Sequence, residues 1–481
     1  MTIAGEHWVS LYTSGFPGTL GAALVERIPA AIADGNPTIA AIRRLHRQFA
    51  APRDVPIAAA EPDAAAGVTP APAEVIMRAM TLRIGGYFTE AAAVCDAVAD
   101  APVPVFETLD DSVRHAYAFY YLHIGITYLL ADRVGEATML LRRAHTAGRG
   151  MFVERDAAGK LALTYAARGV STDAQRWIEE EQHHPPLPGK SETLVRPAGV
   201  IAAALVALDR LDPDAALNML TELRTPADHE EFWAFALYVH GHHALLTGMP
   251  ADGLRHIEAE LQRYPTLYGG VSGLLLDVVR ADLNLALGHL DRARHLIAGS
   301  THPLTAPVRA RACLLRDDPA GAEALVHHYS ADPECGPRVS MELAVLGAAA
   351  ACALGHRTEA RRHLDRASVL SRQTGTVRPW TMVPSSLARE LTSLGIDFPV
   401  ALERMVGEFV VFPVALPLVR LTPRERVILD ALVSGGSAAT IADAEFVSVN
   451  TVKTQLRSLY KKLGVRSRRD ALATARSLGP H

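Results

Sequence analysis

A pattern of paired small residues recurs along the middle of the chain and restricts its possible folds. In the clearest copies a glycine is followed five positions later by an alanine: Gly86 with Ala91, Gly169 with Ala174, Gly288 with Ala293, and Gly355 with Ala360. In weaker copies one member of the pair is a different residue type. These copies are Asp132 and Ala137, Arg210 and Ala215, Gly248 and Gly253, and Asp317 and Ala322. Successive copies are 37 to 46 residues apart, except for one interval of 29, and each lies between two segments with helical periodicity.

This pattern predicts an array of helical hairpins. Glycine ends the first helix of each hairpin because it adopts the left-handed conformation without a steric cost, and the small residue lets the second helix pack closely. A single hairpin cannot bury its own apolar face, so neighbouring hairpins must stack into a superhelix. We therefore predict an all-α fold with an α-solenoid of helical hairpins over residues 74–375. The array resembles tetratricopeptide-type repeats with a period longer than the usual ~34 residues.

The segments on either side of the repeat differ from it in composition. Residues 1–73 combine an N-terminal part that is helical in pattern with an Ala/Pro-rich stretch from residue 50, whose closely spaced prolines prevent a continuous helix and indicate a linker. Residues 376–420 are predicted to be a connector. Its stretch FVVFPVALPLV is apolar, so we expect it to pack on the repeat body rather than face water.

Cysteine usage and hydropathy indicate the compartment. The chain has four scattered cysteines and no CxxC pair, which favours isolated thiols over a disulfide framework or a zinc site: Cys95, Cys313, Cys335 and Cys352. The N-terminus lacks a basic stretch followed by an apolar core, and no apolar run reaches the ~18 residues of a membrane span. We therefore expect a cytoplasmic protein without a membrane partner.

The charge of the chain is divided unevenly. The net charge is −4, which by itself argues against a nucleic-acid partner. From residue 421 to the end, however, there are ten Lys/Arg and five Asp/Glu, whereas the remainder has 38 basic and 47 acidic residues. A basic end on an acidic body is expected where one module contacts phosphate groups.

Residues 421–478 show the pattern of four short helices. Thr422, Pro423 and Glu425 give the N-cap, the first-turn proline and the capping-box acid of a first helix. The buried stripe of that helix is predicted to consist of Val427, Ile428, Leu429 and Leu432. A second helix follows over about 438–444, Ser448 caps a third that runs to about 463, and Ser467 begins a fourth. The solenoid is thus predicted to be followed by a small four-helix helix-turn-helix domain.

The third helix of this tail has two contrasting faces. Its apolar face follows helical spacing: Val452, Leu456, Leu459 and Leu463. The opposite face is polar and basic: Asn450, Lys453, Thr454, Arg457 and Lys461. An amphipathic helix with one cationic, hydrogen-bonding face, placed after a tight turn, can lie in the major groove of DNA.

The motifs of the tail resemble those of a known family. LTPRE, IA, S-x-NTVK and KKLGV-x-SR follow one another as in the LuxR-type, or GerE-like, helix-turn-helix domain. The resemblance implies a sequence-specific transcription regulator whose third helix enters the major groove and whose fourth helix supports dimerisation. With the polar face, it gives candidate base contacts at Asn450, Lys453, Thr454 and Arg457, and candidate phosphate contacts at Thr451, Lys461 and Lys462.

The resemblance also implies partners. These are double-stranded DNA, a second copy of the chain on an inverted repeat and, if the protein is an activator, RNA polymerase. Large LuxR-type regulators such as the maltotriose-responsive activators join an ATPase to helical repeats, but this chain resembles only the repeat and DNA-binding parts. The repeat body would then sense a small ligand or a protein.

Three positions depart from the family pattern. Thr440 replaces the Glu that usually precedes IA, Gln455 replaces a frequent His, and Glu445 stands where a Leu usually packs between the second and third helices. A buried, unpaired carboxylate at Glu445 would be costly, so this side chain is expected to turn outward or to loosen the turn. The alternative function is a helical-repeat adaptor that binds proteins and has a weakened or non-DNA-binding tail.

Other chemical signals are weak. Gly189-Lys190-Ser191 resembles the end of a phosphate-binding loop, but His184 stands where that loop needs glycine, and the neighbouring prolines remove backbone donors. Three adjacent histidine pairs point their rings about 100° apart on a helix, which suits chelation poorly: 183–184, 242–243 and 327–328. We therefore expect no cofactor and no metal site, and the absence of a recognisable nucleophile and base gives no support for an enzyme.

Aromatic residues in the repeat body have two interpretations. Tyr117, Tyr121 and Tyr128 share one helical face, and a second cluster includes Trp233 and Tyr238. Either cluster could line the concave groove of a superhelix, where such arrays bind peptides or small ligands. The alternative is that both clusters are packed between repeats.

Overall fold

The computed structural model describes most of the repeat body and most of the C-terminal domain. The described ranges are 72–99, 111–187, 191–223, 231–264, 268–384, 411–412, 423–445 and 447–462, with single positions at 29, 387, 391, 468 and 471. Across these residues the chain is helical and contains no named strand; one isolated parallel bridge joins Pro384 to Phe412. The all-α prediction is therefore confirmed. Of the linker predicted over residues 50–73, residues 50–71 lie outside the described residues, and Pro72 and Ala73 belong to the first helix of the repeat body. Gly189, Lys190 and Thr422 also lie outside the described residues.

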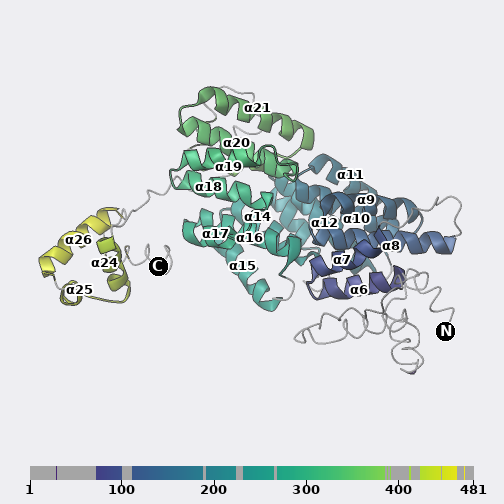
Figure 1. Cartoon of the computed structure of the whole chain (residues 1–481), viewed down its shortest axis with the longest axis horizontal. Helices are drawn as coiled ribbons and strands as arrows, with labels where there is room; N and C mark the ends of the chain where they lie inside the picture. The colour runs from purple at the N-terminus through teal and green to yellow at the C-terminus, as the bar shows by residue number, and fades with distance from the viewer. Residues whose placement is uncertain are drawn as a thin grey trace.

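The repeat body is built from consecutive helical hairpins (Figure 1). The first four pairs are α6 (Pro72–Ile84) with α7 (Phe88–Ala99), α8 (Asp111–Leu130) with α9 (Val134–Ala147), α10 (Phe152–Arg168) with α11 (Ser171–His183), and α12 (Ser191–Asp209) with α13 (Pro213–Leu220). The next four are α14 (Trp233–Leu246) with α15 (Pro250–Arg263), α16 (Gly270–Ala286) with α17 (Leu290–Ile297), α18 (Ala306–Leu315) with α19 (Pro319–Tyr329), and α20 (Pro337–Ala353) with α21 (Arg357–Thr374). Two short 3₁₀ helices are η4 (Pro303–Thr305) and η5 (Arg378–Thr381).

The turn inside each hairpin has the predicted left-handed residue. Glycines at five of the turns have φ between 71° and 80°: Gly86, Gly169, Gly248, Gly288 and Gly355. Non-glycine residues take this conformation at the other three: Asp132 (67°), Leu211 (62°) and Asp317 (60°). At each turn the next residue donates its backbone N–H to the carbonyl five residues earlier, as from His289 to Asn284 at 2.8 Å, which is the Schellman pattern of a helix C-terminus.

One copy of the pattern was assigned one residue too early. The left-handed residue of the fourth turn is Leu211 rather than Arg210, and the fully buried small residue is Ala216 rather than the half-buried Ala215. Leucine rarely adopts positive φ because its Cβ approaches the following carbonyl, so the polar neighbour was the better candidate from sequence. The five-residue spacing itself is preserved.

The small residue of each pair lies where two helices touch. Seven alanines of these pairs are fully buried: Ala91, Ala137, Ala174, Ala216, Ala293, Ala322 and Ala360. In the remaining pair, a Cβ on Gly253 would lie 2.5 Å from the Cβ of Ala244, so glycine is needed for this approach.

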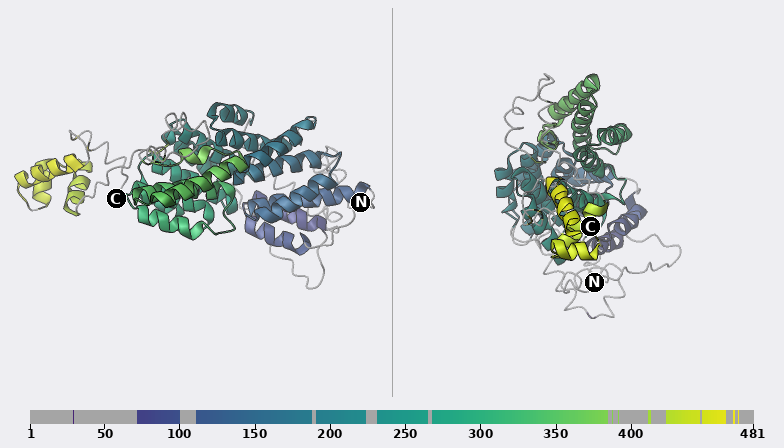
Figure 2. Two further views of the ribbon diagram at one scale, coloured as in Figure 1. Left: turned by 90° about the horizontal axis from the view of Figure 1, so that it is seen from above. Right: turned by 90° about the vertical axis from the view of Figure 1, so that its left-hand side faces the viewer.

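In Figure 2 (left), the purple and blue hairpins lie toward one end of the body, and the green hairpins toward the other.

The last hairpin also packs back on the third one, which a simple linear array would not require. We call the buried residues at this contact the closure cluster: Ser171, Asp209, Arg338, Thr376 and Arg378. The carboxylate of Asp209, at the end of α12, accepts hydrogen bonds from Arg338 on α20 at 2.6 Å and from Arg378 in η5 at 3.0 Å. Arg338 also donates to the carbonyls of Ala166 and Ala167 at the end of α10, both at 2.7 Å.

The apolar stretch of the connector, FVVFPVALPLV, meets the repeat body at its two described positions, Val411 and Phe412. Val411 and Phe412 are buried, and the guanidinium of Arg311 lies 4.7 Å from the centre of the Phe412 ring. Arg311 in turn binds Glu342 at 3.0 Å, the carbonyl of Met382 at 2.8 Å and the carboxylate of Asp282. This part of the apolar connector therefore packs on the body, as its hydrophobicity predicted.

None of the helices that the structure describes is both long enough and apolar enough to cross a membrane.

The C-terminal domain contains α24 (Pro423–Val433), α25 (Ala438–Ala444) and α26 (Val449–Lys462). Figure 1 shows these helices, in yellow, apart from the repeat body. They have a hydrophobic core of their own, which is separate from the two clusters of the body.

Candidate nucleic-acid interface

Helices α24 to α26 hold their positions through a compact apolar core. The buried side chains come from all three helices and from position 471: Ile428, Leu429, Leu432, Ile441, Ala442, Val452, Leu459 and Ala471. Val427 was predicted to belong to this core, but it is 39% exposed. The prediction was wrong because adjacent residues of a helix point about 100° apart, and Ile428 with Leu432 sets the buried face.

Two serines cap the N-termini of α25 and α26. Ser437 is the N-cap of α25, where its hydroxyl accepts the backbone N–H of Thr440 at 3.1 Å. Ser448 does the same for Thr451 at the start of α26, also at 3.1 Å, so its predicted role as a cap is confirmed. The hydroxyl of Thr440 lies 2.6 Å from that of Ser437, so this departure from the family pattern is accommodated within the cap.

The two faces of α26 separate as the pattern predicted. Val452 and Leu459 are fully buried against α24 and α25, and Leu456 is half-buried. The proposed base-contacting residues are all exposed: Asn450, Lys453, Thr454 and Arg457. Within the described part of the chain, the side chains of Lys453 and Arg457 form no ion pair or hydrogen bond, so both cations are available to a partner.

The remaining predicted contacts are only partly described. Thr451 is exposed, and its hydroxyl lies 2.8 Å from that of Ser448. The hydroxyl of Thr454 donates to the carbonyl of Asn450 at 3.0 Å. The side chains of Lys461 and Lys462 lie outside the described residues.

Glu445 is paired rather than isolated. Its carboxylate accepts a hydrogen bond from Arg424 at 2.6 Å, and the same guanidinium donates to the backbone carbonyl of Glu445 at 3.1 Å. The Arg424 side chain is 41% exposed and that of Glu445 is 24% exposed. The carboxylate thus faces the domain surface, where an arginine near the start of α24 neutralises it, and the cost expected for a buried charge does not arise.

Two further side chains fix the arrangement of the helices, and sequence reasoning did not identify these roles. The hydroxyl of Ser458 on α26 donates to the buried carboxylate of Glu425 on α24 at 3.0 Å. Arg468, in the region of the predicted fourth helix, donates to the carbonyl of Gly436 at 3.0 Å. Each bond joins segments about 30 residues apart, a separation at which the sequence gives no pairing signal.

The aromatic clusters of the repeat body are packed between helices. Tyr121, Tyr128, Trp233 and Tyr238 are each at most 7% exposed, and Tyr117 is half-buried against the same core. The hydroxyl of Tyr128 donates to Asp96 at 2.6 Å, and the Trp233 ring lies against that of Tyr264. Their burial favours the packing interpretation over the lining of a groove.

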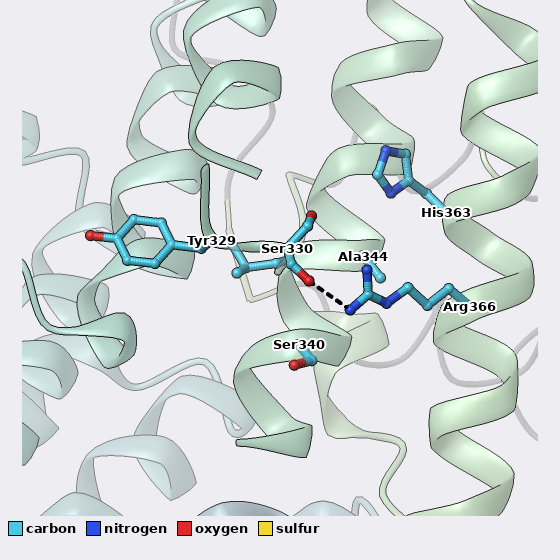
Figure 3. Close-up of a pocket in the computed structure, with 7 residues that line it drawn as sticks. Tyr329, Ser330, Ser340, Ala344, His363 and Arg366 are labelled. Atoms are coloured by element: carbon cyan, nitrogen blue, oxygen red, sulfur yellow. Dashed lines mark hydrogen bonds between the residues drawn. The ribbon is translucent and has the colours of Figure 1, made fainter. Parts of the chain in front are cut away.

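A small pocket lies between α19, α20 and α21 (Figure 3). Its volume of about 10 Å³ is enough for one water molecule. It is lined by Tyr329, Ser330, Ser340, Leu343, Ala344, His363 and Arg366, and the Arg366 guanidinium donates to the carbonyl of Ser330 at 3.1 Å. The pocket is too small for a metabolite and contains none of the predicted aromatic residues.

Comparison with known proteins identifies the C-terminal segment. Residues 419–475 match the family described as bacterial regulatory proteins, luxR family. The chain is 49% identical over 57 residues to the probable transcriptional regulatory protein SgaR of Hyphomicrobium methylovorum, which covers 12% of this chain and 27% of the relative. It is 47% identical over 55 residues to the probable csgAB operon transcriptional regulatory protein of Salmonella typhimurium, covering 11% and 26%.

A third relative matches over a longer stretch. The HTH-type transcriptional regulator MalT of Cronobacter sakazakii is 28% identical over 152 residues, which covers 26% of this chain and 17% of the relative. The chain therefore spans between about a sixth and a quarter of the length of these curated relatives.

Proposed function

We propose that this chain, whose residues 419–475 form a LuxR-family helix-turn-helix domain, is a cytoplasmic DNA-binding transcription regulator. The observation that carries the proposal is the exposed polar face of α26, with Lys453 and Arg457 unpaired among the described residues. A helix of this kind fits the major groove, where arginine and lysine bind guanine and asparagine binds adenine. The relatives named above are transcription regulators, which agrees with this role.

The proposal also assigns each DNA contact either to bases or to phosphates. Asn450, Lys453, Thr454 and Arg457 read base edges, because they lie on the face of α26 opposite Val452 and Leu459. Thr451, Lys461 and Lys462 bind phosphates and set the position of the helix on the duplex. A homodimer on an inverted repeat follows from the resemblance, and RNA polymerase is the further partner if the protein activates.

The repeat body is proposed to sense a small ligand or a protein. Superhelical arrays of this type present an extended concave surface on which such a partner can bind. The alternative of a protein-binding adaptor with a weakened tail rested on Glu445 alone. Since Arg424 pairs with that carboxylate, the observation no longer favours the alternative.

Selection of binding sites from a random duplex pool tests the proposal. The full chain is used at a fixed salt concentration, and the enriched sequence is then measured with wild type, Lys453→Ala and Arg457→Ala. Each substitution should weaken specific binding by about 1–3 kcal/mol, or about 5- to 150-fold, because one base contact is lost. Arg255→Ala is the matched control: it removes the same charge from an exposed side chain of the repeat body, so it should leave affinity unchanged.

The outcomes separate the functions. An enriched sequence with inverted symmetry would support both DNA recognition and dimerisation. Equal binding by wild type, Lys453→Ala and Arg457→Ala would refute the assignment of α26 as the reading helix. Failure to enrich any sequence would refute the proposal of sequence-specific binding for the free full chain and direct the search to protein partners.

A further inference from the structure

Three metal-ligating side chains meet at the surface of the repeat body. His145 lies near the end of α9, Glu154 in the first turn of α10, and Glu180 on α11. One ligand atom from each side chain lies within 4.8 Å of the other two. Three consecutive helices therefore bring together one imidazole nitrogen and two carboxylates, which is a ligand set that divalent transition metals accept.

Neighbouring groups hold two of these side chains in place. The His145 ring meets the Trp177 ring edge-on, with centroids 5.0 Å apart, and its Nε2 lies 3.3 Å from Oε1 of Glu180. Glu154 accepts the backbone N–H of Gly150 at 2.9 Å. The His145 side chain is 16% exposed and that of Glu180 is 43% exposed, so an ion could reach the ligand atoms from solvent.

The electrostatics of the group favour a cation. Within the described part of the chain, neither Glu154 nor Glu180 forms an ion pair with a lysine or an arginine. Two carboxylates about 5 Å apart repel each other by roughly 1 kcal/mol even at the dielectric constant of water. A divalent cation between them would convert this repulsion into two attractions.

Other histidine–carboxylate pairs lack a second carboxylate beside the imidazole ring. His302 pairs with Asp132, and His356 pairs with Glu323, each with a single carboxylate. No further group of three such ligands occurs among the residues that the structure describes. The three side chains are 9 and 26 residues apart, which matches no metal-binding spacing, so their meeting could not be predicted from the sequence.

We infer that His145, Glu154 and Glu180 form a binding site for a divalent transition-metal cation, with Zn²⁺ as the natural probe. Ligand atoms at about 2.0–2.2 Å from a tetrahedral zinc ion are roughly 3.3–3.6 Å apart. The distance of 3.3 Å between Nε2 of His145 and Oε1 of Glu180 already lies in this range. Rotation of the carboxylate side chains can shorten the longest distance between the ligand atoms. The bound ion would link α9 to α10 and α11, and so join two neighbouring hairpins.

Isothermal titration of the chelator-treated full chain with ZnCl₂ tests this site. Wild type should show a site that His145→Ala and Glu180→Gln each weaken by about tenfold or more. Glu323→Gln removes the corresponding carboxylate from the His356 pair and should leave this site unchanged. His145, Glu180 and Glu323 are all partly exposed, so each variant should fold as wild type does. Circular dichroism checks this. If His145→Ala and Glu180→Gln bind Zn²⁺ as wild type does, the inference is overturned.

A local optical signal gives a second readout. Co²⁺ bound at His145 would lie close to Trp177 and should quench its fluorescence, because the two rings are 5.0 Å apart. The quenching should disappear in His145→Ala, and most of it in Trp177→Phe. Equal quenching in wild type and His145→Ala would contradict the site. Neither readout involves DNA, so the outcome is independent of the proposed regulator function.

Discussion

The carboxylate of Asp209, at the end of α12 in the fourth hairpin, joins the last hairpin to the third and fourth hairpins. Its replacement by asparagine tests how much this contact stabilises the repeat body. Asp209 is fully buried and accepts hydrogen bonds from Arg338 at 2.6 Å, from Arg378 at 3.0 Å and from the hydroxyl of Ser171 at 3.1 Å. Both guanidinium groups are themselves buried. Asp209→Asn therefore leaves two buried positive charges without their carboxylate.

The expected loss follows from this burial. Removing one partner of a buried ion pair costs about 3–5 kcal/mol, because the remaining charge is left uncompensated. The body from Pro72 to Thr374 has about 300 residues, and at ~2.1 cal/mol/K per residue its unfolding entropy is about 0.6 kcal/mol/K. The Tm of Asp209→Asn should therefore be about 5–8 °C lower than that of wild type.

Thermal unfolding of the full chain, followed by circular dichroism at pH 7, measures this loss. Asp252→Asn is the control, since it removes the same charge from an exposed pair with Arg255 and should change stability by no more than about 0.5 kcal/mol. A Tm within 1–2 °C of wild type for Asp209→Asn would show that the closure cluster contributes little, and would refute the argument from burial.

The same carboxylate has a defined pH dependence. Burial opposes its ionisation, but the charges of Arg338 and Arg378 outweigh that effect and lower the pKa of Asp209. A lowered pKa in the folded state means that the ionised group stabilises the fold above the unfolded value of about 3.9, and that this contribution is lost as the pH falls through the folded value. The difference in Tm between wild type and Asp209→Asn should stay constant between pH 7 and 5 and shrink below about pH 4.

Two further predictions concern the turns and the C-terminal domain. Gly169 and Gly355 have left-handed φ values of 77° and 80°, so alanine at either should cost about 1–2 kcal/mol. Gly169→Ala should cost more, because its Cβ would lie 2.5 Å from the Cβ of Arg338 whereas that of Gly355→Ala meets open space; equal losses on urea unfolding would contradict this. Glu445→Gln should lower the stability of the C-terminal domain by no more than about 1 kcal/mol, because the pair with Arg424 is partly exposed, and a larger loss in domain unfolding would show that the pair is essential.

The hairpin turns show how much of the backbone conformation local sequence patterns predict. A left-handed residue favours glycine or a short polar side chain, so seven of the eight turns were located at the right residue. The exception, Leu211, takes positive φ despite its Cβ, and its side chain is buried in the core of the repeat body. A local rule fails where the tertiary structure makes a residue accept an unfavourable conformation.

The helix-turn-helix domain shows the same limit at its surface. The faces of α26 follow from helical spacing, so the exposure of Lys453 and Arg457 could be predicted. The ion pair of Glu445 could not be predicted in this way, because its partner Arg424 is 21 residues away on another helix. Helical spacing predicts that a charged side chain lies on the surface, but which residue forms an ion pair with it depends on how the helices cross.

Much of this protein was determined by the sequence itself: the helical hairpins, their turns and the two faces of α26 all follow from patterns that span a few residues. The tertiary structure decided which distant groups meet. Asp209 finds Arg338 and Arg378 at separations of 129 and 169 residues, and His145, Glu154 and Glu180 converge from three helices. The physical reason is that helical periodicity and backbone conformation are local properties, whereas charge pairing across a superhelix depends on the summed rotations of every hairpin between the partners.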